Sequence, residues 1–164
     1  MNIELLKEGI ALHKKNSPKT YKDSINMSVP LFVIHKKIIT GAEEIIKKEY
    51  DLTNSELDVL ASLVIGGGSE CILSPTALYD RLVFSSGGMT KILKKLVSKD
   101  YIIRIDNSED KRSKLVKLTS KGRALFDMAL KEAISYESGY FECLEKEEKE
   151  NLEKILFKIL ENND

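Results

Sequence analysis

The stretch from residue 71 to residue 119 restricts the possible folds of this chain more than any other, because its hydrophobic pattern changes from helical to alternating spacing. Apolar side chains recur at helical spacing after Pro75, and again after the turn-forming sequence Ser85-Ser86-Gly87-Gly88. Residues 101–105 and 115–118 then have the composition of strands, and the polar residues between them suit the turn of a β-hairpin. This stretch therefore predicts two short helices followed by a hairpin, after a short apolar run.

Long helices are predicted before this stretch. Residues 1–16 carry apolar side chains at helical spacing, and the helix is expected to end before Pro18. A long helix is predicted from about Val29 to Tyr50, because proline is favoured in the first turn of a helix and Pro30 would lie there. The N-terminal helix has no partner within the short helices and the hairpin, so we expect it to pack elsewhere.

Three further helices complete the pattern. Thr53 and Glu56 have the spacing of a capping box at the start of one helix, and residues 120–144 and 146–162 are predicted to form two more. Helix, helix, helix and hairpin is the order of a winged helix-turn-helix, so the predicted fold is mainly α-helical with a small β-hairpin wing. The expected division is residues 51–119 for a DNA-binding region, and residues 1–50 and 120–164 for a helical dimerisation region.

Charge is unevenly distributed along the chain, although the 26 basic and 26 acidic side chains cancel overall. Residues 1–73 hold 9 basic and 10 acidic side chains, residues 74–123 hold 12 and 5, and residues 124–164 hold 5 and 11. The middle segment therefore has a net charge of +7 between flanks of −1 and −6. One basic segment between acidic ones indicates a surface that faces a polyanion, and double-stranded DNA is the predicted partner.

The candidate DNA contacts lie at the starts of the two short helices, on the outward face of the second helix and at the hairpin tip. Hydroxyl and backbone N–H groups at a helix N-terminus attract phosphate, and glycine there keeps bulk away from the DNA. Basic side chains at a hairpin tip can straddle the DNA backbone or enter the minor groove. The candidate residues are Ser74, Thr76, Ser85, Ser86, Gly87, Thr90, Lys91, Lys94, Lys95, Lys111, Arg112 and Lys114.

Patterns typical of enzymes, metal sites and membrane proteins are weak. Residues 66–69 are glycine-rich but lack the downstream Lys-Ser/Thr of a P-loop, and the two histidines, His13 and His35, lack closely spaced partner ligands for zinc. The longest apolar stretch, Val59–Gly68, is about half as long as a membrane crossing, and residues 1–15 do not resemble a secretory signal. We expect a cytoplasmic protein that is not an enzyme, holds no metal or cofactor and contacts no membrane.

Two segments of the chain resemble the MarR family of winged helix-turn-helix transcriptional regulators. One runs from Leu73 to Leu96 and contains both short helices, and the other runs from Glu109 through Thr119 to Gly122. The second segment has the family's Asp-x-Arg at Asp110 and Arg112, followed by an apolar strand that ends in Leu-Thr. The chain departs from the family just before it, where Asn107-Ser108 replaces the frequent Asp-Pro.

This resemblance implies a homodimer that binds a palindromic operator. The N- and C-terminal helices of each subunit are expected to form the interface, with one winged helix on each side. In the family the wing arginine contacts DNA, often in the minor groove, and the aspartate stabilises the wing. We assign these two roles to Arg112 and Asp110. A repressor is expected rather than an activator.

The signal that would release the DNA is predicted only by the resemblance. Many family members respond to a small aromatic or phenolic ligand, and Phe32 and His35 on the long helix are candidates for lining its pocket. Other members sense oxidation through cysteine, so a thiol-based regulator using Cys71 or Cys143 stays an alternative. Neither sulfur has a basic neighbour in the local sequence, and Glu70 and Glu142 would disfavour the thiolate. A winged-helix module that binds protein instead of DNA is a further alternative.

Overall fold

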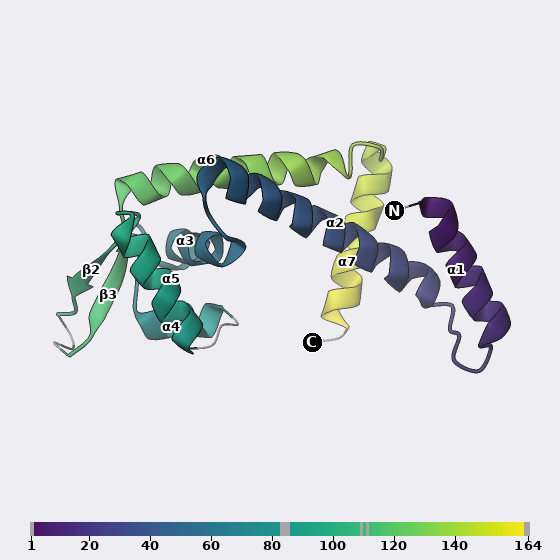
Figure 1. The fold of residues 1–164 in the computed structure, drawn as a ribbon, viewed down its shortest axis with the longest axis horizontal. Coiled ribbons are helices and arrows are strands. Elements are labelled where there is room, and N and C mark those ends of the chain that lie inside the picture. Colours follow the sequence, from purple (N-terminus) through teal and green to yellow (C-terminus); the bar gives the residue numbers. More distant parts are fainter. Residues whose placement is uncertain (1, 83–85, 109, 111, 163–164) are drawn as a thin grey trace. The chain divides into compact units, whose positions relative to one another are not determined.

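The computed structural model describes residues 2–82, 86–108, 110 and 112–162, with the backbone alone at 86 and 87. The chain divides into two compact units, residues 1–40 and residues 41–164. The described elements are, in chain order, α1 (Ile3–Asn16), α2 (Ile25–Tyr50), α3 (Asn54–Gly66), β1 (Ile72–Leu73), α4 (Pro75–Arg81), α5 (Ser86–Ser98), β2 (Ile102–Asp106), β3 (Lys114–Leu118), α6 (Ser120–Gly139) and α7 (Lys146–Glu161) (Figure 1). The mainly helical fold with a small wing is confirmed.

The first unit contains α1 and the N-terminal part of α2. The predicted start of α2 at Val29 is wrong, because the helix already begins at Ile25. Turn-like hydrogen bonds start it early: the Ile25 N–H donates to the Lys22 carbonyl oxygen, and the Ser28 N–H donates to the Ser24 carbonyl oxygen. Pro30 therefore lies inside the helix and not in its first turn, where a proline removes one backbone hydrogen bond.

The second unit begins its winged domain with a capped helix, as predicted. The Glu56 N–H donates to Thr53 Oγ1, and the Thr53 N–H donates to Glu56 Oε2, which completes the capping box of α3. The two-stranded hairpin is extended by a third strand, because β1 pairs antiparallel with β3 and gives the order β1-β3-β2. Leu73 lies opposite Val116 in this pairing, so the short apolar run before α4 closes the sheet.

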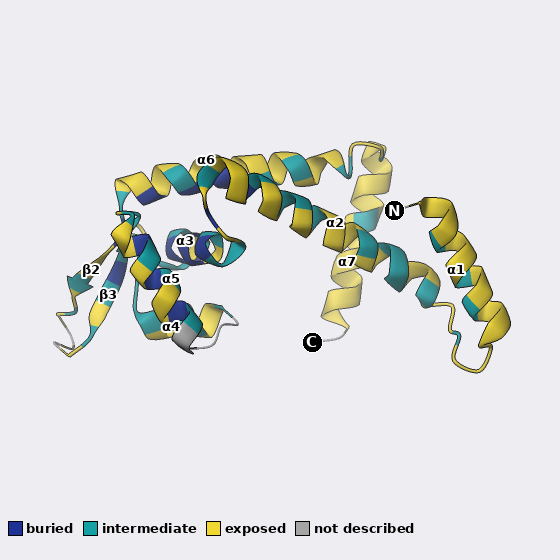
Figure 2. Cartoon of the chain, viewed as in Figure 1, coloured by how far each residue is buried: buried dark blue, intermediate teal, exposed yellow. Residues whose placement is uncertain are grey.

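The hydrophobic core of the second unit is built around α3, which contacts α4, α5, α6, β1 and β3. Figure 2 shows buried positions on α3, α5 and β3, whereas α7 is largely exposed. Phe126 and Ala129 of α6 belong to the same core, so the start of α6 is packed against the winged domain. The remaining fully buried apolar side chains of the core include Leu52, Leu60, Leu63, Leu78, Met89, Leu93, Leu96, Ile102 and Val116. The region boundaries predicted at residues 51 and 119 stay a prediction.

The two C-terminal helices are shorter than predicted. α6 ends at Gly139 and not at residue 144, because the N–H groups of Tyr140 and Phe141 donate three residues back and tighten the chain into turns. α7 follows from Lys146, and no residue of this helix is buried. Among the described residues, no helix combines the length and the apolar character needed to cross a membrane.

Candidate DNA-binding interface

The first short helix, α4, is positioned by its cap. Ser74 Oγ accepts a hydrogen bond of 3.1 Å from the Ala77 N–H, and Pro75 occupies the first helical position, where its missing N–H costs nothing. Leu78 anchors the helix in the core. Ser74 is thus partly buried and engaged in capping, whereas Thr76 is exposed at the first turn. Both stay candidates for DNA contact.

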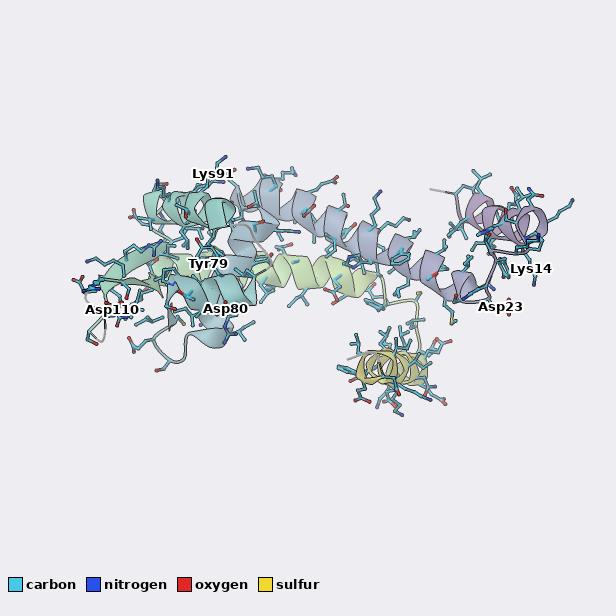
Figure 3. All side chains as sticks on the ribbon, turned by 90° about the horizontal axis from the view of Figure 1, so that it is seen from below. Lys14, Asp23, Tyr79, Asp80, Lys91 and Asp110 are labelled. Carbon is cyan, nitrogen blue, oxygen red and sulfur yellow. The ribbon has the colours of Figure 1, made fainter. Side chains whose placement is uncertain are left out.

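The second short helix, α5, separates an apolar side from a polar side. Met89, Leu93 and Leu96 are buried, whereas Thr90, Lys91 and Lys94 are exposed. Figure 3 shows Lys91 on the outer side of α5. The backbone at the start of α5 includes two other candidates, although their side chains are not described. These are Ser86 and Gly87; Ser85 lies outside the described residues.

Lys95 is arranged differently from its neighbour Lys94. Its Nζ lies 2.7 Å from Glu56 Oε1, and the Glu56 side chain is only 2% exposed. Burial by itself raises the pKa of Glu56, but the hydrogen bonds from Lys95 and Thr53 outweigh it, so the pKa lies below its usual range. Lys95 is predicted from the sequence as a candidate DNA contact. In the structure its ammonium group forms an ion pair with the buried carboxylate of Glu56 on α3.

The Glu56 carboxylate is expected to make the stability of the protein depend on pH. Because the folded-state pKa is lowered, its stabilising effect is fully present above the unfolded-state pKa of about 4.3 and is lost as pH falls through the folded-state value. Glu56→Gln removes the charge and keeps a side chain that suits a capping box. The free energy of unfolding in urea, measured from about pH 6 to about pH 3, should therefore fall more steeply for wild type than for the variant. Parallel curves would contradict this assignment.

The wing is closed by hydrogen bonds around Asp110. Its Oδ1 accepts from the Arg112 N–H at 3.0 Å, and its carbonyl oxygen accepts from Ser113 Oγ at 3.1 Å. Asn107 Nδ2 donates to Ser113 Oγ across the turn, so a side-chain amide ties the wing at the position where the family often has Asp-Pro. Figure 3 shows Asp110 at the tip of the hairpin. These contacts support the wing-stabilising role that we assign to Asp110.

The basic side chains of the wing differ in their surroundings. Arg112 is exposed next to the tip, whereas Lys114 forms an ion pair with Asp106 on the neighbouring strand. Lys111 lies outside the described residues. Arg112 is therefore the described wing cation best placed to reach DNA.

Sequence reasoning did not single out Arg104. This exposed residue of β2 lines a surface hollow of about 380 Å³ together with Lys94 and Val97 of α5. The alternating pattern of the strand and the positive charge of the middle segment could have indicated an exposed cation at Arg104. Neither signal shows which helix a strand residue will lie beside. Arg104 therefore lies next to Lys94, which is one of the candidate DNA contacts.

Cys71 lies beside cations that the local sequence does not supply. It lines a hollow of about 470 Å³ with Lys117 of β3 and Arg123 of α6. The pKa of Arg123 is raised, mainly by its hydrogen bond to Asp127 and to a smaller extent by Cys71. Cys143 is exposed, and its Sγ lies 3.7 Å from the Tyr140 carbonyl oxygen. The local sequence supplies no cation beside either sulfur, and the cations that lie beside Cys71 come from β3 and α6.

The two candidate effector residues are on α2, within the first unit. Phe32 is 68% exposed, and His35 is also exposed. Within the part of the chain that is described, no group of three or more His, Cys, Asp or Glu side chains is arranged to hold a metal ion. The effector role of Phe32 and His35 stays a prediction.

Comparison with known proteins agrees with this geometry. Residues 42–129 match the family described as transcriptional regulator SarA/Rot. An uncharacterized HTH-type transcriptional regulator of Bacillus cereus (strain ATCC 14579) is 28% identical over 113 residues, which are 69% of this chain and 70% of that protein. The regulator SarZ of Staphylococcus aureus (strain USA300) is 34% identical over 95 residues, which are 58% of this chain and 62% of SarZ.

A solved structure extends the similarity to most of the fold. A mutant of MarR from E. coli, complexed with operator DNA, superposes with a TM-score of 0.64 and 27% identity, covering 85% of this chain and 99% of that one. The matched family region contains α3, the helix-turn-helix, the wing and the first half of α6. The chain therefore belongs to the SarA/Rot family of transcriptional regulators, which are DNA-binding proteins of the MarR-type winged-helix fold.

Proposed function

We propose that this protein is a repressor that binds a palindromic operator as a homodimer and is released by a small aromatic or phenolic ligand. The main support for DNA binding is the exposed polar side of α5. Thr90, Lys91 and Lys94 lie there, opposite an apolar side that is packed in the core. Arg112 adds an exposed cation at the wing tip. The operator complex of E. coli MarR, a protein of the same fold, supports this use of the winged domain.

The homodimer is supported by apolar surface that the single chain leaves open. Four large apolar side chains of α7 are between 53% and 59% exposed: Ile155, Phe157, Ile159 and Leu160. Large apolar side chains left this exposed mark an interaction site, and a two-fold axis lets the same surface serve both subunits. A dimer also places two α5 helices on one DNA, so half-sites about ten base pairs apart are expected.

The release signal rests on the family resemblance, for which Phe32 and His35 are the candidate pocket residues. A thiol-based signal is the second candidate, and the contact of Arg123 with Cys71 favours that thiol over Cys143. The regulator model assigns no catalysis to this chain, and it locates the protein in the cytoplasm with the DNA it binds.

The proposal is tested by selecting bound fragments from the genome of the source organism and footprinting them. The expected result is an imperfect palindrome, occupied by two subunits and protected mostly on one side of the duplex. A footprint on one unrepeated half-site with one subunit contradicts the dimer. If the protein binds every duplex weakly and this binding does not change with salt concentration, a module that binds protein instead of DNA is favoured. A compound screen against the selected fragment then identifies the releasing ligand.

The wing makes a separate prediction. Arg112→Ala is expected to weaken operator binding by about 1–3 kcal/mol and to reduce the preference for A·T-rich flanks, because a narrow A·T-rich minor groove attracts arginine. The preference within the palindromic core should stay, since α5 reads that part. Binding to the selected operator and to a flank-shuffled version measures both effects. Unchanged affinity and unchanged flank preference would show that the wing does not read DNA.

A further inference from the structure

Lys95 near the end of α5, and Lys99 just after its last residue Ser98, form ion pairs with acids on neighbouring elements. Lys95 Nζ lies 2.7 Å from Glu56 Oε1 on α3, and Lys99 Nζ lies 2.7 Å from Asp51 Oδ2 in the connection between α2 and α3. Lys99 Nζ also donates to the Asp51 carbonyl oxygen at 3.1 Å. We call Asp51, Glu56, Lys95 and Lys99 the α5 ion-pair cluster.

Both acids of the cluster are held in place by other contacts. Glu56 is fixed by its capping box with Thr53, and Asp51 also accepts from Lys47 of α2. Asp51 has a φ of +50°, a left-handed conformation that aspartate tolerates better than most residues. The acids therefore form a fixed support against which α5 is oriented.

The C-terminal end of α5 has a further tie to α6. Lys121 Nζ donates to the Lys99 carbonyl oxygen at 2.9 Å, and Thr119 Oγ1 donates to the Asp100 carbonyl oxygen at 2.7 Å. The residues at and just after the end of α5 are thus bonded to α3, to the connection between α2 and α3, and to α6. Lys91, in the first turns of the helix, is exposed and does not belong to the cluster.

The electrostatics agree with a structural use of these lysines. The buried Glu56 carboxylate would be left uncompensated without Lys95, which is costly in a protein interior. The pKa of Lys99 is raised, mainly by its hydrogen bond to Asp51, and the pKa of Asp51 is lowered by Lys47 and Lys99. Lys94 forms no such pair in the described structure and is exposed.

We propose that the α5 ion-pair cluster holds α5 in the orientation that reads the operator, and that Lys95 is a positioning residue and not a phosphate contact. The proposal rests on the proposed function, in which α5 lies in the major groove. A positioning residue acts on specific binding, since correct orientation is needed to reach base edges. A phosphate contact acts on all DNA alike and adds to the salt dependence of binding.

The test compares two duplexes over a salt series: the operator recovered by fragment selection, and a duplex of the same length and composition with scrambled sequence. Lys95→Met is expected to weaken operator binding by about tenfold, a size typical of coupled contacts, and to leave scrambled-duplex binding and the salt slope unchanged. The matched control is Lys94→Met, one residue earlier, which should lower the slope by about one on both duplexes.

Three more variants separate positioning from other causes. Lys95→Arg keeps the ion pair and should retain wild-type operator binding. Glu56→Gln should weaken operator binding about as much as Lys95→Met, and the double variant should be no weaker than either single one, because both remove the same interaction. Circular dichroism confirms that each variant is folded. If Lys95→Met or Glu56→Gln does not fold, Asp51→Asn and Lys99→Met repeat the comparison at the exposed acid.

Two results would overturn the proposal. If Lys95→Met lowers the salt slope by about one on both duplexes while Glu56→Gln binds normally, Lys95 is a phosphate contact. If the cluster variants bind both duplexes as wild type does, α5 does not depend on the cluster. Failure of the proposed function is recognised earlier, because wild type itself would then fail to distinguish the operator from the scrambled duplex.

Discussion

Replacing Gly122 by alanine is expected to destabilise the protein by about 2–4 kcal/mol, although alanine is normally the better helix former. A Cβ at this position would overlap the carbonyl oxygen of Tyr101 and lie 2.8 Å from its carbonyl carbon. These are backbone atoms just before β2, so they cannot rotate away as the end of a side chain can. The Gly122 N–H also donates to Thr119 Oγ1 at 2.9 Å, which caps α6. Overpacking here would displace α6 from the sheet.

Gly139 supplies the control on the same helix. Nothing lies within 4 Å of a Cβ at that position, so Gly139→Ala should be neutral or stabilise by about 0.5 kcal/mol. Urea unfolding followed by circular dichroism gives both free energies. A loss below about 0.5 kcal/mol for Gly122→Ala would mean that α6 does not pack against Tyr101 as described.

Removing residues 146–164 is expected to abolish the dimer and to weaken operator binding by about 10²- to 10⁴-fold. The deletion removes α7, whose apolar side chains are exposed in the single chain and whose burial we assign to a second copy. Two linked winged domains bind a two-half-site operator far more tightly than one, because the second contact becomes intramolecular. Sedimentation and binding to the selected operator measure the two effects together.

A pair of full-length variants makes this prediction specific to the apolar side of α7. Ile155→Glu with Ile159→Glu places two charges on that side and should produce monomers, whereas Lys154→Ala with Lys158→Ala changes exposed charges on the same helix and should leave the dimer intact. A truncated chain that still sediments as a dimer and binds its operator with full affinity would refute the assembly proposed here.

The order of the elements and the family could be predicted from the sequence, because the signals involved are local. The Thr53–Glu56 capping box and the Ser74 cap join residues three positions apart, and the structure contains both. Helical and alternating periodicities located the helix-turn-helix and the wing in the same way. Element boundaries were less accurate where a competing local contact decided them, as at the start of α2 and the end of α6.

Contacts between distant segments were decided only by the tertiary structure. Periodicity shows that Lys94 and Lys95 lie on the polar part of a helix, but only the packing of α3 beside α5 brings a buried Glu56 to Lys95 and leaves Lys94 exposed. The third strand likewise depends on pairing Ile72 with Lys117, and the cation beside Cys71 comes from α6. A sequence specifies the face on which each side chain lies, while its partner depends on which element packs against that face.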